Sequence, residues 1–450
     1  MDWELRILQA LEGSRPGWDE PPDWRAVLAL YEGLAPDEAA ALDRTVVRMI
    51  DLGYRNPHAS REPGPFDQIE VSLPAGMAPA DLLCIEAAVL VAAERGLGDA
   101  YFPFLRLMSV PTWHVIQGRL TWLAREALDA QRRLSLTRAG RGLGALLGLA
   151  AADALGCTVE FMSREAIRAR WPEGHREIVG GGPFGFPAGD WTDDTAMAVA
   201  VGRGILEQPD DPVDAVGRHF VAWFQSGPPD VGNTCRTAIN AFLRLGSWEA
   251  ASAAVRAELG QWAAGNGALM RTLPAALAYG PDPAQAIRIG RMTHPHPESD
   301  AAIAVYHRTV DALLEGAAPA EALEAGLAPL PGAEPEVGAA IADLARRLSG
   351  LASRPAERIR SGGYVVETLE AALWAFLRTD SLEECVVLAV NLGDDADTVG
   401  AVAGGLAGAA YGPGAVPRRW SQALRRRAVI DELAAGLYGV FRARQGDTRK

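Results

Sequence analysis

Cysteine is scarce in this chain and is never clustered. Among 450 residues there are four cysteines, Cys84, Cys157, Cys235 and Cys385, and none forms a Cys-x-x-Cys pair. This scatter argues against a disulfide framework and against a zinc knuckle. The chain also lacks an uninterrupted apolar run of about 18 residues, which a membrane-spanning helix needs. Because its first residues, Met1-Asp2-Trp3-Glu4, are acidic and unlike a secretion signal, we expect a cytoplasmic protein without a membrane partner.

An excess of basic residues is also missing. Lysine and arginine number 43 against 57 aspartates and glutamates, which gives a formal net charge of -14. Such a chain is poorly suited to nucleic acid, because that binding depends on basic side chains displacing counterions from phosphates. The clearest basic run, Arg425-Arg426-Arg427, lies in a helical stretch and is interpreted as a solvated helix face. We therefore do not expect a nucleic-acid partner.

Strand-like alternation is rare, and helical patterns dominate. The best strand candidate, residues 68–73, is short. Elsewhere apolar residues recur at spacings of three and four, which is typical of helices. Ser381, followed three residues later by Glu384, has the form of a capping box at a helix start. These patterns predict an all-α fold with at most a few minor strands.

The composition changes near residue 135. A chain of 450 residues is long for one domain, and its first part is irregular, with prolines at Pro16, Pro21 and Pro22. We expect residues 1–135 to form a helical accessory domain of unknown role, open to a protein partner. Beyond it, glycine and alanine crowd into residues 142–153 and again into 400–411. Because glycine permits close backbone approach, the pattern predicts a densely packed bundle within a second domain, residues 136–450.

The first of two acidic clusters is Thr192-Asp193-Asp194-Thr195. It directly precedes an apolar helical stretch, which places it at an expected helix N-terminus. Capping explains one such residue, since Asp and Thr both cap helices well. Two adjacent carboxylates repel each other, however, and capping uses only one. Taken alone, this cluster fits capping and metal binding equally.

The second acidic cluster has three carboxylates in four positions, again before a helix: Asp394, Asp395 and Asp397. Negative charge at this density needs counter-charge. Asp395, Asp397 and Thr398 can converge on one point, and oxygen-only ligands suit Mg²⁺, with Mn²⁺ as a substitute. Neither cluster contains histidine or cysteine, which argues against zinc. Together the clusters offer enough oxygens for two cations, which can orient a substrate and stabilise developing charge.

Three weaker features lie between the clusters. The turn Gly265-Asn266-Gly267 has backbone N–H groups that could receive phosphate oxygens, although an ordinary turn is the better interpretation of it alone. His294 and His296 are better explained as loop histidines than as a metal site. Tyr364 follows a glycine turn and could equally stack on a base or pack in the core.

Taken in order, these motifs resemble the ADP-ribosylglycohydrolase family, which includes the ADP-ribosylarginine hydrolases and the dinitrogenase-reductase-activating glycohydrolase. The matching segments are residues 153–156 with Glu160, 192–195, 265–271, 293–294, 363–369 and 391–398. The resemblance implies a compact orthogonal helical bundle around a dinuclear Mg²⁺ centre. The family commonly has glycine where this chain has Ala152 and Asp394, and neither change removes a ligand. Asp394 adds a negative charge beside the expected centre.

The resemblance also implies a role for each matching residue. One ion would be bound by Thr192, Asp193 and Asp194, the other by Asp395 and Thr398, and both by Asp397. The catalytic residues would be Glu160, Asp193 and Asp397, with Glu160 beside the second ion and close to the scissile bond. Substrate would be contacted by Asp153, Asn266, Gly267, His294 and Tyr364, with Asn266 and Gly267 near the phosphates.

The implied reaction is hydrolysis of the glycosidic bond between ADP-ribose and an acceptor. The first candidate for the acceptor is an arginine side chain of a protein, and a small ADP-ribose conjugate is the other. Water would attack the anomeric carbon through an oxocarbenium-like transition state, and Glu160 or a metal-bound carboxylate would accept its proton. Two alternatives differ in class. One is an immunity or binding protein that sequesters an ADP-ribosylating toxin or an ADP-ribosylated target, and the other is a Mg²⁺ enzyme acting on phosphate esters or diphosphates.

Overall fold

The computed structural model describes residues 136–446, which lie within one compact unit, Leu134–Lys450. The predicted accessory domain, residues 1–135, and the strand candidate within it lie outside the described residues. In the described part, helices and short 3-10 turns are joined by loops with two isolated β-bridges and no strand, which confirms the all-α prediction. No helix of this part is long and apolar enough to cross a membrane.

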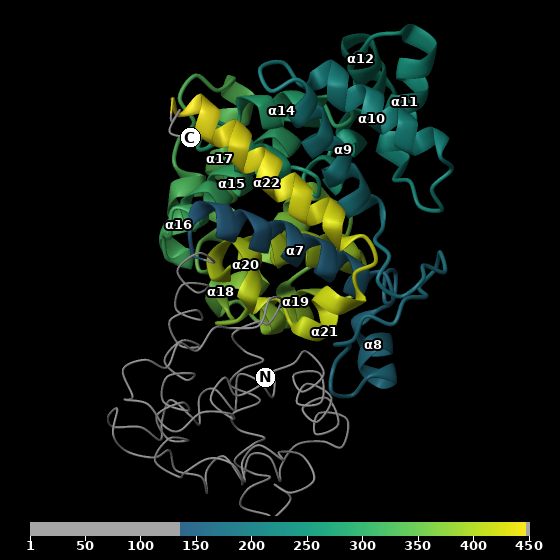
Figure 1. Cartoon of the computed structure of the whole chain (residues 1–450), viewed down its shortest axis with the longest axis vertical. Helices are drawn as coiled ribbons and strands as arrows, with labels where there is room; N and C mark the ends of the chain where they lie inside the picture. The colour runs from purple at the N-terminus through teal and green to yellow at the C-terminus, as the bar shows by residue number, and fades with distance from the viewer. Residues whose placement is uncertain (1–135, 447–450) are drawn as a thin grey trace, which may run out of the picture. The chain divides into compact units, whose positions relative to one another are not determined.

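The α-helices of this unit follow one another through short loops (Figure 1). They are α7 (Arg138–Gly156), α8 (Arg164–Arg170), α9 (Asp193–Glu207), α10 (Val213–Gln225), α11 (Asn233–Leu245), α12 (Trp248–Leu259), α13 (Leu273–Tyr279), α14 (Ala284–Arg291), α15 (Pro297–Leu314), α16 (Pro319–Leu327), α17 (Pro335–Leu348), α18 (Val365–Leu377), α19 (Leu382–Val390), α20 (Ala396–Tyr411), α21 (Arg418–Ala423) and α22 (Arg427–Arg444). The longest interval between consecutive α-helices lies between α8 and α9.

Helices α7 and α20 pack against each other along most of their length (Figure 1). A Cβ atom added at Gly148 would lie 2.2 Å from the backbone oxygen of Gly404, and one at Gly404 would lie 2.2 Å from that of Gly148. No larger side chain fits this crossing without moving a helix, because protein interiors are close-packed. The predicted dense packing of the two small-residue segments is therefore confirmed.

Other helices surround this pair. Helix α22 packs against α7 and α9, whereas α18 and α19 pack against α20. One large cluster of buried apolar side chains runs through these helices. Helix α19 begins after Ser381, as predicted, and the Ser381 hydroxyl accepts a hydrogen bond from the Glu384 N–H group at 3.2 Å. The pair α7–α20 is thus held from several sides, so the two helix ends that carry acidic residues have little freedom to separate.

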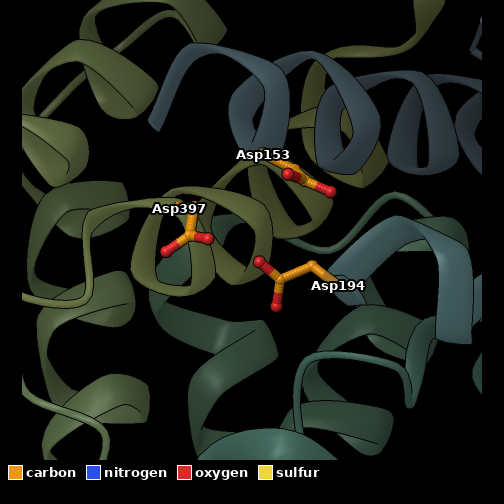
Figure 2. Close-up of side chains that lie close together, drawn as sticks. All are labelled: Asp153, Asp194 and Asp397. Carbon is orange, nitrogen blue, oxygen red and sulfur yellow. The ribbon is translucent and has the colours of Figure 1, made fainter. Parts of the chain in front are cut away.

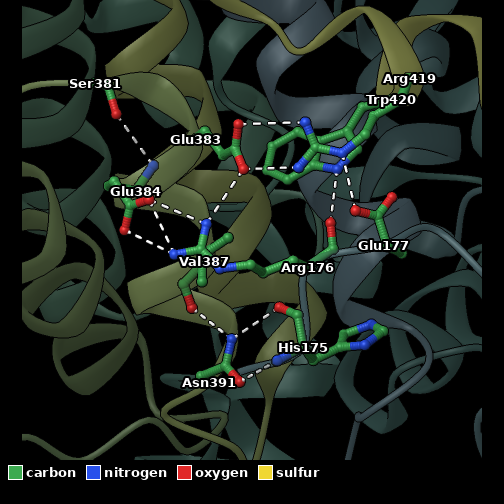
Figure 3. Close-up of polar contacts among 10 residues, drawn as sticks. All are labelled: His175, Arg176, Glu177, Ser381, Glu383, Glu384, Val387, Asn391, Arg419 and Trp420. Carbon is green, nitrogen blue, oxygen red and sulfur yellow. Dashed lines mark hydrogen bonds and ion pairs between the residues drawn. The ribbon is translucent and has the colours of Figure 1, made fainter. Parts of the chain in front are cut away.

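Polar contacts fasten the start of the long α8–α9 segment to α19 and α21 (Figure 3). The Asn391 side chain donates to the backbone oxygen of His175 at 3.0 Å and accepts from its N–H group at 2.8 Å. The buried Trp420 indole donates to the backbone oxygen of Arg176 at 2.8 Å. Arg176 also pairs with Glu383 at 3.2 Å, a half-exposed pair of the kind that contributes little alone. The segment therefore starts from a fixed position.

The basic run Arg425-Arg426-Arg427 is about half exposed, as predicted, but it is not a helix face, because Arg425 and Arg426 lie in the turn before α22. Arg425 and Arg426 lie 3.3 and 3.4 Å from the Asp190 carboxylate. The Arg426 guanidinium also lies 4.1 Å from the centre of the Trp191 ring. Two of the three arginines therefore hold the residues that directly precede the first acidic cluster.

Candidate active site

The first acidic cluster begins helix α9, with Thr192 as the N-cap residue. The Thr192 hydroxyl accepts a hydrogen bond from the Asp194 N–H group at 3.3 Å. Asp193 and Asp194 are both buried. Capping is thus done by the threonine, and the two carboxylates remain for other contacts. Helix capping and metal binding, the two interpretations of this cluster, are therefore compatible with each other.

Asp153, at the end of α7, anchors the first cluster. Its carboxylate accepts hydrogen bonds from the N–H groups of Thr192 and Thr195, each at 3.0 Å, and from the Thr195 hydroxyl at 2.5 Å. The end of α7 also lies directly against the second cluster, since a Cβ at Gly156 would be 2.4 Å from the Cα of Asp397. Helix α7 therefore brings the two clusters together.

The second cluster begins helix α20, with Asp395 at the N-cap and Asp397 in the buried first turn. Asp394 has a φ of 55°, in the left-handed region where glycine is favoured and aspartate is one of the better tolerated residues. Its backbone oxygen accepts from the Phe161 N–H group at 2.6 Å, and its own N–H group donates to Met162 at 2.9 Å. At the position of Asp394 the family usually has glycine. In this chain the residue lies in a turn whose backbone is hydrogen-bonded to the segment that follows Glu160.

Two groups of carboxylates result. Asp153, Asp194 and Asp397 converge from α7, α9 and α20 (Figure 2), and one oxygen of each lies within 4.8 Å of the others. Glu160, Asp230 and Asp397 form a second group by the same measure. Asp397 belongs to both groups, so it lies where one residue could contact two cations.

The buried oxygens of these groups lack the partners that buried polar atoms normally have. Within the described residues, one oxygen each of Glu160, Asp194 and Asp397 is buried without a hydrogen bond. Burial raises the pKa of Asp194 and of Asp397 well above the usual range, and repulsion from neighbouring carboxylates adds to this shift. The same causes raise the pKa of Glu160 to about 9. Unpartnered oxygens among mutually repelling acids are the environment that a cation stabilises, so this region can bind metal.

Some predicted ligands lie beside these groups rather than in them. The Asp193 carboxylate accepts a hydrogen bond from the Gly232 N–H group at 3.3 Å, and burial and the charge of Asp230 raise its pKa well above the usual range. Thr398 is buried in the first turn of α20. Burial raises the pKa values of Asp194 and Asp395, and the Thr398 hydroxyl opposes this shift. The structure thus places all six predicted metal ligands in one region. Of these six residues, however, only Asp194 and Asp397 belong to the two converging groups of carboxylates.

The loop Gly265–Gly267 adjoins the second cluster through Asn266. The Asn266 side chain donates to the Asp395 carboxylate at 2.7 Å and to the Thr368 hydroxyl at 2.9 Å. Its backbone N–H group donates to Gly363 at 3.0 Å. All N–H groups of Asn266 are therefore used within the protein. Their evident role in this structure is to position Asp395.

His294 lies against this loop and is held in one orientation. A Cβ at Gly267 would be 2.9 Å from the Cε1 atom of His294. Arg271 donates to the Thr293 hydroxyl at 2.6 Å, and that hydroxyl lies 2.7 Å from the Nδ1 atom of His294. Burial lowers the pKa of His294 well below its usual value, so the ring is neutral. If the threonine donates to Nδ1, Nε2 carries the proton and faces the loop as a donor.

Two aromatic side chains flank the same loop. Tyr364 is partly exposed and forms an isolated β-bridge with Gly265. Trp262, three residues before Gly265, is 77% exposed, and sequence analysis did not single it out. The structure therefore brings the predicted substrate residues Gly267, His294 and Tyr364 together around one loop.

Asp230 is the main site residue that sequence analysis missed. It lies in the turn Gly227-Pro-Pro-Asp-Val-Gly232, before α11. A single aspartate among glycines and prolines is typical of an ordinary turn, so the local sequence carries no further signal. Burial raises the pKa of Asp230, whose neighbours include Asp193, Asp395 and Asp153. Only the folded chain brings it to Glu160 and Asp397.

The geometry agrees with comparisons to known proteins. The family model for ADP-ribosylglycohydrolase matches residues 134–447. The chain belongs to the ADP-ribosylglycohydrolase family. This confirms the predicted family and its reaction class, hydrolysis of the glycosidic bond between ADP-ribose and an acceptor. The comparisons do not favour the alternative of a protein that only binds.

Individual relatives agree with this assignment. The ADP-ribosyl-[dinitrogen reductase] glycohydrolase of Rhodospirillum rubrum is 37% identical over 62% of this chain and 88% of its own length. The ADP-ribosylarginine hydrolase Tri1 of Serratia proteamaculans is 32% identical over 66% of this chain and 78% of its own. A solved structure described as an ADP-ribosylglycohydrolase-related protein complex is 37% identical, with a TM-score of 0.57, and covers 68% of this chain and 99% of that one.

Proposed function

We propose that this protein removes ADP-ribose from arginine side chains of proteins in a reaction that depends on two Mg²⁺ ions, with Mn²⁺ as a substitute. The observation that carries the proposal is the convergence of buried carboxylates on Asp397, with three oxygens that have no partner. The names of the Rhodospirillum and Serratia relatives support a protein acceptor and an arginine linkage, respectively. A small ADP-ribose conjugate would be a second substrate of the same site.

Asp397 is the proposed shared ligand of the two ions. Asp194, with Thr192 and Asp193, would hold one ion, and Asp395 with Thr398 would hold the other. The converging groups add Asp153 and Asp230 as further carboxylates around the same centre. When bound, the ions would supply positive charge that orients ribose hydroxyls and stabilises charge developing on the sugar.

The residues of the chain would move the protons. With the ions bound, which would favour its ionised form, Glu160 would accept a proton from the attacking water while the oxygen of the water bonds to the anomeric carbon. The bond from that carbon to the guanidino nitrogen breaks, and the nitrogen takes up a proton. Asp230, grouped with Glu160 and with a pKa that burial raises, would supply it. Positioned acids and bases of this kind typically contribute about 10²–10⁴ in rate.

The loop at Gly267 would hold the diphosphate. The neutral His294 beside it would donate a hydrogen bond, and Tyr364 would stack on the base. Asn266 would act through Asp395, because its N–H groups are already used within the protein. A substrate held at this loop and at the acidic centre would be fixed at both ends, which favours one orientation of the scissile bond.

Product analysis tests the proposal. The full-length protein is incubated with a protein ADP-ribosylated on arginine, with Mg²⁺ or with EDTA, and the released molecules are separated. Released ADP-ribose that disappears in EDTA and returns with Mg²⁺ or Mn²⁺ is the expected result. Inorganic phosphate would instead indicate the phosphoesterase alternative, and binding without product would indicate a sequestering protein. Full activity without metal would overturn the proposed centre.

Two further predictions concern a protein partner and the location of the protein rather than the acidic centre. A protein partner for residues 1–135 is one of them, and it has no support from the comparisons. Cytoplasmic location is the other. Neither affects the assignment of the acidic centre, whose residues all lie between 153 and 398.

A further inference from the structure

An aromatic patch made of Phe161, Phe184 and Phe186 lies beside the acidic centre. Phe161 directly follows Glu160 in the sequence, and its side chain is 66% exposed. The ring centres of Phe161 and Phe184 are 6.3 Å apart, and those of Phe184 and Phe186 are 6.4 Å apart. Phe184 and Phe186 are half-buried, so Phe161 is the most exposed ring of the patch. Aromatic side chains grouped at the surface are typical of binding surfaces rather than of ordinary protein surface.

The position of Phe161 is fixed by an unusual backbone conformation. Its φ of 60° lies in the left-handed region, which is unfavourable for a bulky side chain. The Phe161 N–H group donates to Asp394 at 2.6 Å, and this contact holds the conformation. Strain that surrounding contacts maintain is found mainly at functional sites. Here it directs a large apolar side chain to solvent next to a buried acidic residue.

Phe184 and Phe186 lie in a loop that is held equally firmly. Gly181 and Phe186 exchange two backbone hydrogen bonds, at 2.7 and 2.9 Å. A Cβ at Gly182 would lie 1.8 Å from the backbone oxygen of Cys157, so the loop packs directly on the residue that follows α7. The patch is therefore preorganised, which reduces the entropy lost when a partner binds.

The loop that carries Phe184 and Phe186 is apolar. Residues 178–189 contain no charged side chain. Val179 is 56% exposed, and Pro183 and Pro187 are exposed as well. This segment belongs to the interval between α8 and α9, which reaches the edge of the bundle (Figure 1). The side chains of this loop thus offer no positive charge to the phosphates of ADP-ribose.

The ring geometry also provides no slot for a nucleotide base, which the proposed function places on Tyr364. Phe161 and Phe184 are inclined by 70°, and Phe184 and Phe186 by 71°. Such edge-to-face rings leave no parallel pair between which a flat base could stack. Apolar side chains of a polypeptide fit these surfaces. A polypeptide would also come close to the acidic centre whenever its modified side chain entered it.

We propose that the aromatic patch binds the acceptor protein next to its ADP-ribosylated residue. This inference rests on the proposed function and adds a recognition surface to it. The ADP-ribose would occupy the acidic centre and the Gly265–Gly267 loop, whereas the polypeptide on either side of the modified residue would lie on the patch. The patch would therefore affect protein substrates and leave small conjugates unaffected.

Paired substrates test this inference on the full-length protein. Lysozyme ADP-ribosylated on arginine serves as the protein substrate, and ADP-ribosyl-agmatine as the small one. For the double variant Phe184→Ala/Phe186→Ala, we expect kcat/KM with modified lysozyme to fall about tenfold or more, mainly through KM. With ADP-ribosyl-agmatine it should stay within about twofold of the unaltered protein, since each tenfold change needs about 1.4 kcal/mol of lost interaction. Phe161 is kept, because it adjoins Glu160.

The matched control removes two exposed apolar side chains elsewhere. Leu243 and Leu245 of α11 are 47% and 52% exposed, and Leu243→Ala/Leu245→Ala should leave both substrates unaffected. The conservative variant Phe184→Leu/Phe186→Leu keeps apolar surface and should recover part of the lost protein turnover. It also serves as the test variant if the alanine pair does not fold.

The outcomes separate this inference from the proposed function. Equal losses on the two substrates would overturn it, because the patch would then serve ADP-ribose or the fold. No loss on modified lysozyme would overturn it as well. If the unaltered protein releases ADP-ribose from neither substrate, the proposed function fails and this inference fails with it.

Discussion

The two acidic clusters both begin a helix, but the rest of the protein holds them in different ways. The first is anchored through its backbone, because the Asp153 carboxylate accepts from the N–H groups of Thr192 and Thr195. The second is anchored through a side chain, because Asn266 donates to the Asp395 carboxylate. One anchor adds negative charge to the centre, and the other adds hydrogen-bond donors. Loss of the first should mainly affect folding, and loss of the second should mainly affect the reaction.

The largest effect is expected where the clusters meet. Asp397→Ala removes the residue common to both carboxylate groups and should lower the rate by at least about two orders of magnitude, on the scale of positioned catalytic groups. Turnover with arginine-linked ADP-ribose and calorimetric titration with Mg²⁺ measure the two consequences. Both should be impaired while the thermal unfolding transition remains cooperative. Normal turnover in this variant would contradict a centre built on Asp397.

Metal removal should reveal the charge held in the centre. Burial raises the pKa of Asp153 to about 6 and that of Glu160 to about 9, so the folded protein holds these protons more tightly than the unfolded chain does. Stability therefore falls as pH rises from about 4, where such acids ionise when unfolded, to about 9. Mg²⁺ favours the ionised acids and should offset the loss.

Thermal unfolding at several pH values measures this effect. In EDTA, Tm should decrease from pH 5 to pH 9, by more than in Mg²⁺, so the difference between the two conditions widens with pH. A difference that is constant over this range would show that these carboxylates do not interact with the cation.

A pair of substitutions tests the different anchoring directly. In Asp153→Asn, an amide NH₂ group faces backbone N–H donors, and the loss of charge-assisted hydrogen bonds should cost about 1.5–3 kcal/mol of stability when measured in Mg²⁺. Asn266→Ala should cost less stability but lower kcat about tenfold, because Asp395 loses a donor that orients it. Urea unfolding and turnover are measured on both variants. A greater stability loss in Asn266→Ala would reverse the comparison.

The smallest effect is expected at Asp394. The φ at this position is 55°, which glycine adopts without strain. Glycine also increases the entropy of the unfolded chain, which opposes this gain in stability. Asp394→Gly should therefore change the free energy of unfolding by less than about 1 kcal/mol and keep most activity. Urea unfolding and turnover again provide the measurement. A loss as severe as that of Asp397→Ala would mean that the roles within the second cluster are wrongly assigned.

Local sequence was informative wherever the signal lies in neighbouring residues. The predicted starts of α9 and α20 follow from polar residues directly before apolar helical stretches, and Thr192 caps α9 in the structure. The close α7–α20 packing follows from the glycine and alanine content of both segments. Asp230 and the aromatic patch had no comparable local signal. A lone aspartate in a turn, or a phenylalanine in a glycine-rich loop, has the same local pattern whether or not it lies beside a site.

By itself, the sequence determined the helical class, the family and the two places where carboxylates concentrate, because periodicity, capping and charge density are properties of short segments. The tertiary structure alone decided which carboxylates meet. Adjacent residues of a helix point about 100° apart, so the packing of α9 decides that Asp194, rather than Asp193, converges with Asp397. The tertiary structure likewise decided that Asn266 contacts Asp395 and that Asp230 lies beside Glu160. These contacts join segments far apart in the chain, and only close packing of the helices brings them within hydrogen-bonding or ligand distance.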